Sequence, residues 1–447
     1  MTTEILITAA AFLAGASLAW AQPAETGASP TESREEQKLT WDRIELKTDG
    51  GPLPFVVEAP ATPERDADGL VYSASIVNGP ERIPVRVRAQ EGGYEGPGEA
   101  LIEFLHYDSW IQTAGADVGR TSGSLSHHLG PGLWKKKRGE KYATVEVNSK
   151  PVSSAHDRFD PIEGAGEAAD LTGRWRVSFS SSEDDAVGEF KIDTETGLAT
   201  GTFLTTTGDY RFLEGRVDGG LLRLSVFDGA HAFLFKANVQ ADGSLKGNFW
   251  SGNWWHETWT AVRDDDAVLA DAMEETTWQG DTELEELVFK NLDAQPTSVA
   301  QALDALDDDG GRATIMLVFG SWCPNCADAT DYLVELQRTY ADRGLRVLGV
   351  AFEITGDIER DAKQVRIHQE HHGADWPVLI AGLSDKKEAS KAFPVLDRIR
   401  SYPTAVFLNR AREPVGVWTG FSGPATGDAY DDLRERWVRL IEELLDG

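Results

Sequence analysis

The fold is decided by the run ATIMLVFGSWCPNC, residues 313–326. Its apolar first half is typical of a buried strand, and the apolar spacing over residues 327–340 predicts a helix. Cys323 and Cys326 therefore lie where a strand meets a helix. Backbone N–H groups and the dipole at a helix N-terminus stabilise a thiolate at the first sulfur. The second sulfur, one turn later, can close a disulfide with the first.

These two cysteines are the only ones in the chain of 447 residues. Two other interpretations of the pair are open. It could be half of a zinc site, which needs two further Cys or His ligands at compatible spacing, or it could be an inert structural bridge. We favour a redox-active pair because its position at the start of a helix activates the first thiol.

Strands and helices alternate in the last part of the chain. The expected strands are residues 313–319, 345–352, 376–380, 404–408 and 415–419, and the expected helices are 327–340, 358–372 and 428–445. Alternation of this kind predicts a layered α/β domain, which we expect over residues 283–447. An acidic connector, residues 265–282, precedes it.

The motif GSWCPNC, together with Tyr402-Pro403-Thr404 downstream, resembles the thioredoxin superfamily, specifically its TlpA-like periplasmic thiol-disulfide oxidoreductases. The likeness covers residues 284–445. It implies a thioredoxin-like fold and exchange with protein thiols or disulfides without a cofactor. It also implies an upstream membrane or periplasmic redox partner.

The resemblance also assigns roles to individual residues. Cys323 is expected at an exposed helix start as the attacking thiol, and Cys326 faces the helix packing as the resolving thiol. Pro403 is expected to be cis and to lie against the active-site disulfide, where its loop binds the extended backbone of a substrate protein. The expected substrate-binding residues are Trp322, Pro324, Tyr402 and Pro403.

The sequence departs from the family at two positions that could carry a proton. Thioredoxins have a buried acid where this chain has Leu317, and TlpA-like proteins often have a glutamate where it has Ala329. Glu353, at the end of the next buried strand, is therefore our candidate proton acceptor for Cys326. The alternative is a surface acid. A peroxiredoxin is less well supported, because Gly320 replaces the threonine expected three residues before its cysteine.

Residues 39–264 consist of short β-rich runs separated by Gly, Asp and Asn. The expected strands are residues 85–88, 100–107, 142–147, 173–179, 188–192, 199–205, 210–217, 221–227, 232–239, 247–250 and 255–262. Alternation of apolar and polar residues predicts antiparallel sheet. We expect a β-rich region over 39–165 and a β-meander over 166–264, which can close into a barrel. Weak similarity between the two suggests a duplication whose halves share one barrel or sandwich.

The N-terminus and the net charge indicate where the protein acts. Residues 5–20 carry no charge and precede the Ala19-Trp20-Ala21 cleavage pattern, so we expect a signal peptide over 1–21 and a flexible linker over 22–38. An uncleaved segment would instead be an anchor. The predicted location is periplasmic or otherwise extracytoplasmic. A net charge of −31 argues against nucleic-acid binding.

Other charged and glycine-rich motifs have simpler interpretations. His368, His371 and His372 could offer imidazoles on one helix face, but no distant cluster completes a metal site, so we expect a solvated face and no metal. Lys135-Lys136-Lys137-Arg138 predicts a charged hairpin. The Gly-rich run 420–427 predicts a structural turn, and the polar and aromatic runs 208–211 and 227–231 could line a pocket.

Two functions from different classes follow from these patterns. The first is an extracytoplasmic thiol-disulfide oxidoreductase whose β-region positions it or selects a partner. The second is a β-barrel binding protein for a small ligand or peptide, in which the thioredoxin-like domain is a redox-sensitive appendage. The tryptophans at positions 250, 254, 255 and 259 slightly favour a pocket, although core packing also accounts for them.

Overall fold

The computed structural model describes residues 39–60, 64–66, 69–89, 98–116, 129–280 and 283–446. The expected signal peptide and linker lie outside these ranges. Among the helices in the described ranges, none is both long enough and apolar enough to cross a membrane.

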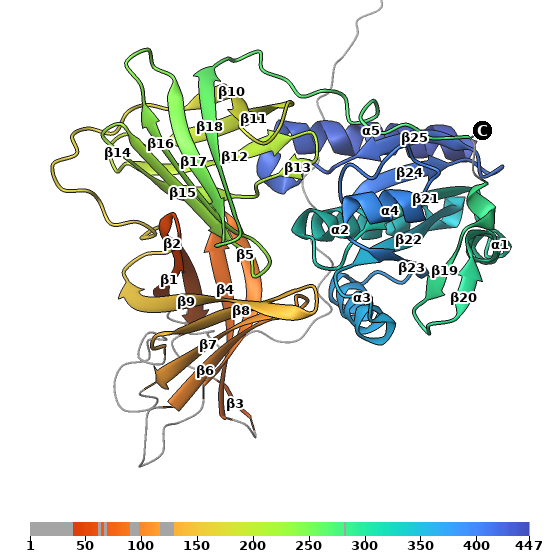
Figure 1. The fold of residues 1–447 in the computed structure, drawn as a ribbon, viewed down its shortest axis with the longest axis horizontal. Coiled ribbons are helices and arrows are strands. Elements are labelled where there is room, and N and C mark those ends of the chain that lie inside the picture. The colour runs from red at the N-terminus through yellow and green to blue at the C-terminus, as the bar shows by residue number, and fades with distance from the viewer. Residues whose placement is uncertain are drawn as a thin grey trace, which may run out of the picture. The chain divides into compact units, whose positions relative to one another are not determined.

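The first β-rich region is a closed antiparallel barrel (Figure 1). Its strands are β1 (Leu39–Thr48), β2 (Gly51–Pro60), β3 (Glu64–Asp66), β4 (Gly69–Asn78), β5 (Glu81–Ala89), β6 (Gly98–Phe104), β7 (Ser109–Ala116), β8 (Gly132–Arg138) and β9 (Lys141–Val152). Neighbours in sequence pair around the ring, β1 pairs with β9, and β2 pairs with β4, so that only β3 stays outside it.

The second β-rich region closes in the same way. Its strands are β10 (Gly173–Phe179), β11 (Asp185–Ile192), β12 (Leu198–Thr205), β13 (Gly208–Asp209), β14 (Leu213–Asp218), β15 (Leu221–Phe227), β16 (Ala232–Val239), β17 (Leu245–Ser251) and β18 (Trp255–Arg263). Here β10 pairs with β18, and β13 pairs only with β12 at the rim.

The expectation that the two halves share one barrel or sandwich is wrong. In each half the first and last strands pair with each other, so each sheet closes on itself. Each ring has an apolar core, and the core of the first barrel also includes Phe227, Ala232 and Leu234 of the second. The two rings have the same strand order. Phe104 ends β6 and Phe227 ends β15, which are matching places in the rings, and their side chains meet edge to face at 5.6 Å. Duplication remains a hypothesis that this agreement supports.

Two expected strands are shorter than the sequence pattern indicated. The strand expected over residues 100–107 ends at Phe104, and the one expected over 210–217 begins only at Leu213. In the second case Arg211 has a φ of +62°, and its backbone N–H donates to Asp209 Oδ1 at 2.6 Å. This local turn breaks the strand and directs the Arg211 side chain away from the barrel wall.

Residues 284–446 contain a mixed sheet covered by helices. The order is β20-β19-β23-β22-β21-β24-β25. Strands β21, β22 and β23 are parallel, β24 is antiparallel to β21, and β25 is antiparallel to β24. The strands are β19 (Val288–Asn291), β20 (Pro296–Ser298), β21 (Ala313–Phe319), β22 (Leu345–Glu353), β23 (Val378–Leu383), β24 (Thr404–Leu408) and β25 (Pro414–Thr419). The helices are α1 (Val299–Asp308), α2 (Pro324–Tyr340), α3 (Ile358–His372), α4 (Lys386–Ala392) and α5 (Asp428–Asp446).

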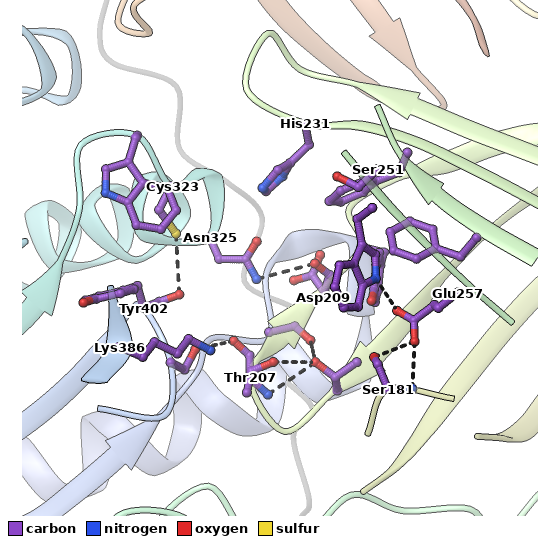
Figure 2. A pocket seen from close by; sticks show the side chains of 18 residues that line it. Ser181, Thr207, Asp209, His231, Ser251, Glu257, Cys323, Asn325, Lys386 and Tyr402 are labelled. Atoms are coloured by element: carbon purple, nitrogen blue, oxygen red, sulfur yellow. Dashed lines mark hydrogen bonds between the residues drawn. The ribbon is translucent and has the colours of Figure 1, made fainter. Parts of the chain in front are cut away.

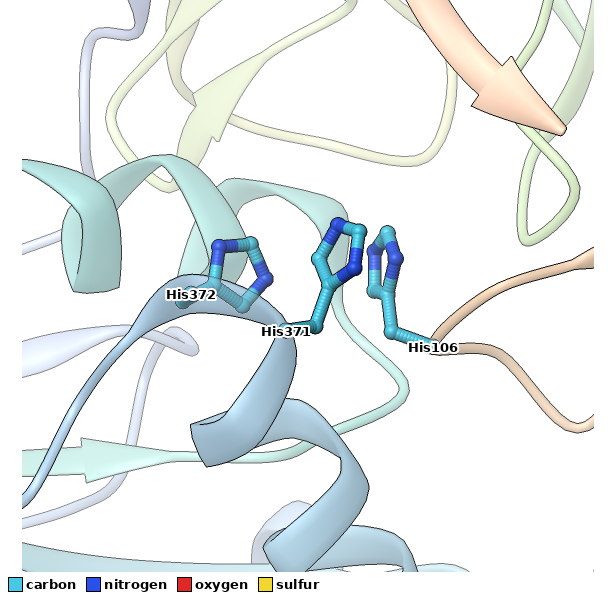
Figure 3. Close-up of side chains that lie close together, drawn as sticks. All are labelled: His106, His371 and His372. Atoms are coloured by element: carbon cyan, nitrogen blue, oxygen red, sulfur yellow. The ribbon is translucent and has the colours of Figure 1, made fainter. Parts of the chain in front are cut away.

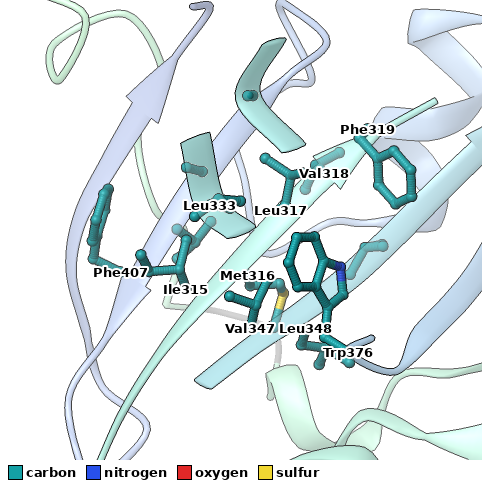
Figure 4. Close-up of a cluster of buried hydrophobic side chains, with 14 of the residues drawn as sticks. Ile315, Met316, Leu317, Val318, Phe319, Leu333, Val347, Leu348, Trp376 and Phe407 are labelled. Atoms are coloured by element: carbon teal, nitrogen blue, oxygen red, sulfur yellow. The ribbon is translucent and has the colours of Figure 1, made fainter. Parts of the chain in front are cut away.

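The strand β21 lies inside this sheet, between β22 and β24, and is buried along its whole length. Figure 4 shows its side chains packed between those of neighbouring strands and of α2. Leu317, which occupies the position of the family's buried acid, is fully buried in this apolar cluster. An ionisable group there would need a partner, and the apolar packing provides none.

The expectation of a solvated face for the three histidines of α3 is wrong for His368 and His372. His368 is 1% exposed and its Nε2 lies 3.0 Å from Thr330 Oγ1 on α2. The His372 side chain is 5% exposed, and its Nδ1 lies 2.7 Å from Asp331 Oδ1. The packing of α3 on α2 covers these rings, and only His371 is exposed.

The Arg211 side chain joins three parts of the molecule. It is 8% exposed, and its guanidinium donates to Asp328 Oδ2 on α2 at 2.7 Å and to Glu81 Oε1 of the first barrel at 2.6 Å. Asp228 Oδ2 lies 3.7 Å from its Nε. Because the site is buried, the pKa of Asp328 rises to about 7 even beside the guanidinium. The guanidinium of Arg211 therefore offsets the negative charge of the three surrounding carboxyl groups.

We predict that Arg211→Met lowers the free energy of unfolding by about 3–5 kcal/mol, because it leaves buried carboxylates without their partner. Urea unfolding at pH 7.5 measures the loss. The control is Arg176→Met, which removes a half-exposed arginine paired with Asp264 on the surface of the second barrel, and it should cost about 0–1 kcal/mol. Equal losses in the two variants would contradict the role of Arg211.

Candidate active site

Cys323 is the N-cap residue of α2, in the extended conformation, and Pro324 follows as the first helical residue. Proline suits that position because its fixed φ is already helical and its missing N–H has no partner to lose. The backbone N–H of Cys326 donates to Cys323 O at 3.1 Å, which places the two cysteines one turn apart. Both are free thiols.

The expectation that Cys323 sits exposed is wrong. The residue is 6% exposed, and Cys326 is completely buried. Cys323 Sγ lies 3.5 Å from Tyr402 O, and part of the second barrel covers the start of α2. Burial raises the pKa of the Cys326 thiol well above its ordinary value, and hydrogen bonding with Cys323 raises it further.

The Tyr402–Pro403 peptide bond is cis, as expected from the resemblance. The Tyr402 ring packs edge to face with Trp322 at 5.6 Å, and Trp322 Nε1 donates to Phe352 O at 2.9 Å. The fold thus brings Trp322 and Tyr402 together beside Cys323.

A cavity of about 450 Å³ opens beside Cys323 (Figure 2). Its wall on the helix side consists of Trp322, Cys323, Asn325, Lys386, Ser401 and Tyr402. The opposite wall belongs to the second barrel and consists of Ser181, Thr205, Thr207, Gly208, Asp209, Tyr210, His231, Phe233, Phe249, Ser251, Trp255 and Glu257. The sequence had indicated the runs 208–211 and 227–231 as possible pocket residues, but it gave no signal for Lys386 or Asn325.

Residues 205–211 of the second barrel, the docking loop, lie directly on the Cys-x-x-Cys motif. Asn325 Nδ2, between the cysteines, donates to Asp209 O at 3.5 Å, and Ser401 Oγ donates to Thr207 O at 2.5 Å. Gly208 has a φ of +145°, and a Cβ there would come within 2.0 Å of Asn325 Nδ2. Only glycine permits this close approach. The docking loop therefore covers part of the surface around Cys323.

Glu353 is buried at the end of β22, so the surface-acid alternative is wrong. Its carboxylate accepts hydrogen bonds from Ser321 N and Ser321 Oγ, both at 2.8 Å, two residues before Cys323. Burial raises the pKa of Glu353 to about 7, although the bonds from Ser321 oppose the rise. Burial and the neighbouring Cys323 are the main causes of the raised pKa of Cys326, and the charge of Glu353 contributes a smaller rise. The two groups are therefore electrostatically linked, and proton transfer between them remains a prediction.

Lys136 of the first barrel also belongs to the surroundings of Cys323. The expected charged hairpin is present in β8 and β9, but Lys136 turns inward, donates to Ala230 O and lines a small cavity with Trp322. Burial lowers its pKa to about 8, while Asp228 and Cys323 act in the opposite direction. The sequence pattern could not distinguish this lysine from its solvated neighbours.

Comparison with known proteins gives a likeness to a thioredoxin-like protein but no family assignment. No family model matches the chain. The thioredoxin-like protein YneN of Bacillus subtilis (strain 168) is 30% identical over 105 residues, which are 24% of this chain. The chain spans about half, 55%, of that curated relative. The sequence likeness supports a thioredoxin-like part in this protein.

Two solved structures illustrate the structural comparison. One is a thiol:disulfide interchange protein of the thioredoxin family from Chlorobium tepidum TLS, with 22% identity, a TM-score of 0.26, and coverage of 35% of this chain and 92% of that one. The other is a DsbF homologue from Corynebacterium diphtheriae, with 17% identity, a TM-score of 0.26, and coverage of 38% and 92%.

We predict that Glu353→Gln changes how stability depends on pH. The native carboxyl holds its proton up to about pH 7, whereas an unfolded glutamate ionises near pH 4.5. Glu353 therefore stabilises the native state fully at low pH, and this contribution is lost as the pH rises toward 7. Relative to wild type, Glu353→Gln should gain a few kcal/mol of stability between pH 5 and 7.5.

Urea unfolding of the reduced protein at pH 5, 6, 7 and 7.5 measures this difference. Asp328 titrates in both proteins and cancels in the comparison. Glu140→Gln, which removes an exposed carboxylate from the first barrel, controls for the change in net charge. A constant difference between Glu353→Gln and wild type across this range would exclude a raised pKa for Glu353.

Proposed function

We propose that this protein is an extracytoplasmic thiol-disulfide oxidoreductase that acts through Cys323 and Cys326. One observation carries the proposal. Cys323 caps the N-terminus of α2 and lies on the wall of a 450 Å³ cavity, with the buried Cys326 thiol one helical turn behind it. A substrate sulfur in this cavity can reach the first cysteine, and only the protein's own second cysteine can reach the bond that then forms.

The exchange balances without a cofactor. The Cys323 thiolate attacks one sulfur of a substrate disulfide, forms a mixed disulfide and releases the other sulfur as a thiolate. Cys326, after losing its proton, attacks Cys323 Sγ and releases the second substrate thiolate. The substrate disulfide is reduced to a dithiol, and the two cysteines are oxidised to a disulfide. The reverse sequence oxidises a substrate dithiol.

Glu353 is the proposed proton acceptor for the second step. Burial raises the pKa of the Cys326 thiol, so Cys326 needs a base before it can attack. The pKa of Glu353 is about 7, which suits a group that takes a proton and gives it back near neutral pH. Ser321 holds the carboxylate through two hydrogen bonds beside the motif.

The cavity limits which substrates can react. Tyr210, Phe233, Phe249 and Trp255 form an aromatic wall opposite Cys323, and the docking loop covers Asn325. We propose that the reactive sulfur belongs to an extended peptide segment or to a small thiol, because a disulfide on the flat face of a folded protein could not enter. The upstream redox partner would have to present its cysteine in the same extended form.

The second candidate function is a binding protein whose cysteines only sense redox state. The observation that favours it is the cavity's second wall, since most of its lining comes from the barrel and not from the Cys-x-x-Cys side. Such a protein would bind its ligand in both redox states and would form no covalent intermediate with it.

We predict that Cys326→Ser accumulates a mixed disulfide through Cys323 when it meets an extended peptide containing a disulfide, because the resolving thiol is missing. Cys323→Ser should accumulate none. Intact mass measurement after acid quenching detects the adduct, and the variant with both serines is the control. Trapping by Cys323→Ser alone would reverse the two roles, and no trapping by either variant would favour the binding protein.

A further inference from the structure

A second cluster of reactive side chains lies where α3 meets the first barrel, away from the cavity beside Cys323. One face of α3 contacts the turn that connects β6 to β7. Arg360 Nη2 forms an ion pair with Asp108 Oδ2 at 2.8 Å, and Gln364 Nε2 donates to His106 O at 2.7 Å. These contacts hold the backbone of His106 against the helix.

Three imidazoles converge at this contact (Figure 3). His106 comes from the turn of the first barrel, and His371 and His372 come from the last turn of α3. One ring nitrogen from each lies within 4.8 Å of the others. The His106 ring stacks on His371 at 4.1 Å between centroids and meets His372 edge to face at 5.1 Å.

Three ring nitrogens of this cluster lack the partners that buried polar atoms normally have. Neither nitrogen of His106 has a hydrogen-bond partner among the described residues, and neither does His372 Nε2. The other nitrogen of His372, Nδ1, lies 2.7 Å from Asp331 Oδ1. In metal sites a carboxylate on one ring nitrogen orients the other nitrogen toward the ion. Unsatisfied buried donors or acceptors are uncommon and require an explanation.

Burial favours the neutral form of two of these imidazoles. Burial, together with the neighbouring His371 and His372, lowers the pKa of His106 to about 2. Burial likewise lowers the pKa of His371. Neutral imidazoles have a free lone pair, which is the form that binds metals. The exposed ring of His371 leaves the cluster open to solvent on one side.

We propose that His106, His371 and His372 form a zinc site with a fourth position open to water. Three imidazoles with one open position are a recognised zinc ligand set, and zinc is usually four-coordinate and tetrahedral. Zn–N bonds of about 2.0–2.1 Å place tetrahedral nitrogens about 3.4 Å apart, so the rings must close by up to about 1.4 Å. The exposed His371 ring can make most of this movement by rotation.

Zinc at this position would tie the first barrel to the helix that carries the cysteines. Asp331 is on α2, and next to it Thr330 Oγ1 donates to Cys326 O at 2.8 Å. Thr330 also contacts His368 Nε2 at 3.0 Å, and the His368 ring packs on His372 at 4.5 Å. The ion would therefore stabilise the contact between the barrel and α2. The site does not depend on the proposed exchange reaction.

Zinc titration of the full chain tests this proposal. Both cysteines are replaced by serine in every protein used, because thiolates also bind zinc, and bound metal is removed with EDTA before calorimetry at pH 7.5. We expect one equivalent of zinc to bind and to raise Tm in a way that EDTA reverses. Cobalt(II) in place of zinc should give the visible absorption of a tetrahedral site.

Three variants and one control identify the ligands. His371→Ala removes an exposed ring, so it should keep the fold and lose at least about 100-fold in zinc affinity. His106→Ala should lose as much, and Asp331→Asn should lose about 10–100-fold as a positioning residue. The control is His256→Ala on the second barrel, where the ring stacks on Trp250, and its affinity should match that of the parent.

Each alternative result overturns the assignment. Zinc binding no tighter than millimolar in the folded parent protein would exclude a site. Tight binding that His371→Ala leaves unchanged would place the ion elsewhere. Binding of copper(II) without zinc would exclude zinc as the ion.

Discussion

The arrangement of the molecule depends on one buried guanidinium. Arg211 belongs to the second barrel, yet its partners are Glu81 of the first barrel and Asp328 of α2. Asp328 is on α2, two residues after Cys326. The contact with Arg211 therefore fixes the position of the helix that carries the cysteines relative to the barrels. The positive φ of Arg211 ends the expected strand early and lets the side chain reach both partners. With Arg211 in place, the docking loop meets Asn325 and the cavity beside Cys323 acquires its second wall.

This arrangement changes what the Cys-x-x-Cys motif can do. A thiol at an open helix N-terminus would meet any disulfide that diffuses to it. Here Cys323 is 6% exposed, and its access is through a cavity whose aromatic side chains come from a different part of the chain. The barrels therefore act as part of the site. Lys136 from the first barrel adds a cation near the same sulfur, since the charge of Cys323 acts on its pKa.

The sequence predicted the local features well because each has a local cause. The apolar run of β21 and the strand patterns of β15 and β16 act within a few residues, and their expected bounds agree with the structure. The helix expected over 327–340 begins three residues earlier, at Pro324. Ring closure by β1 with β9 and by β10 with β18 joins segments far apart in the chain, and no local pattern encodes it. The contact of His106 with His371 and the burial of Cys323 also join segments far apart in the chain, so the sequence pattern did not predict them.

The most direct test of the account is an equilibrium titration of the full chain in glutathione buffers of defined potential. After alkylation of free thiols, intact mass reports how many of the two cysteines are oxidised. The account predicts a single two-electron transition in which Cys323 and Cys326 are protected together, with no species that keeps one free thiol at equilibrium. Two thiols that stay free at every potential, or that react with glutathione independently, would contradict it.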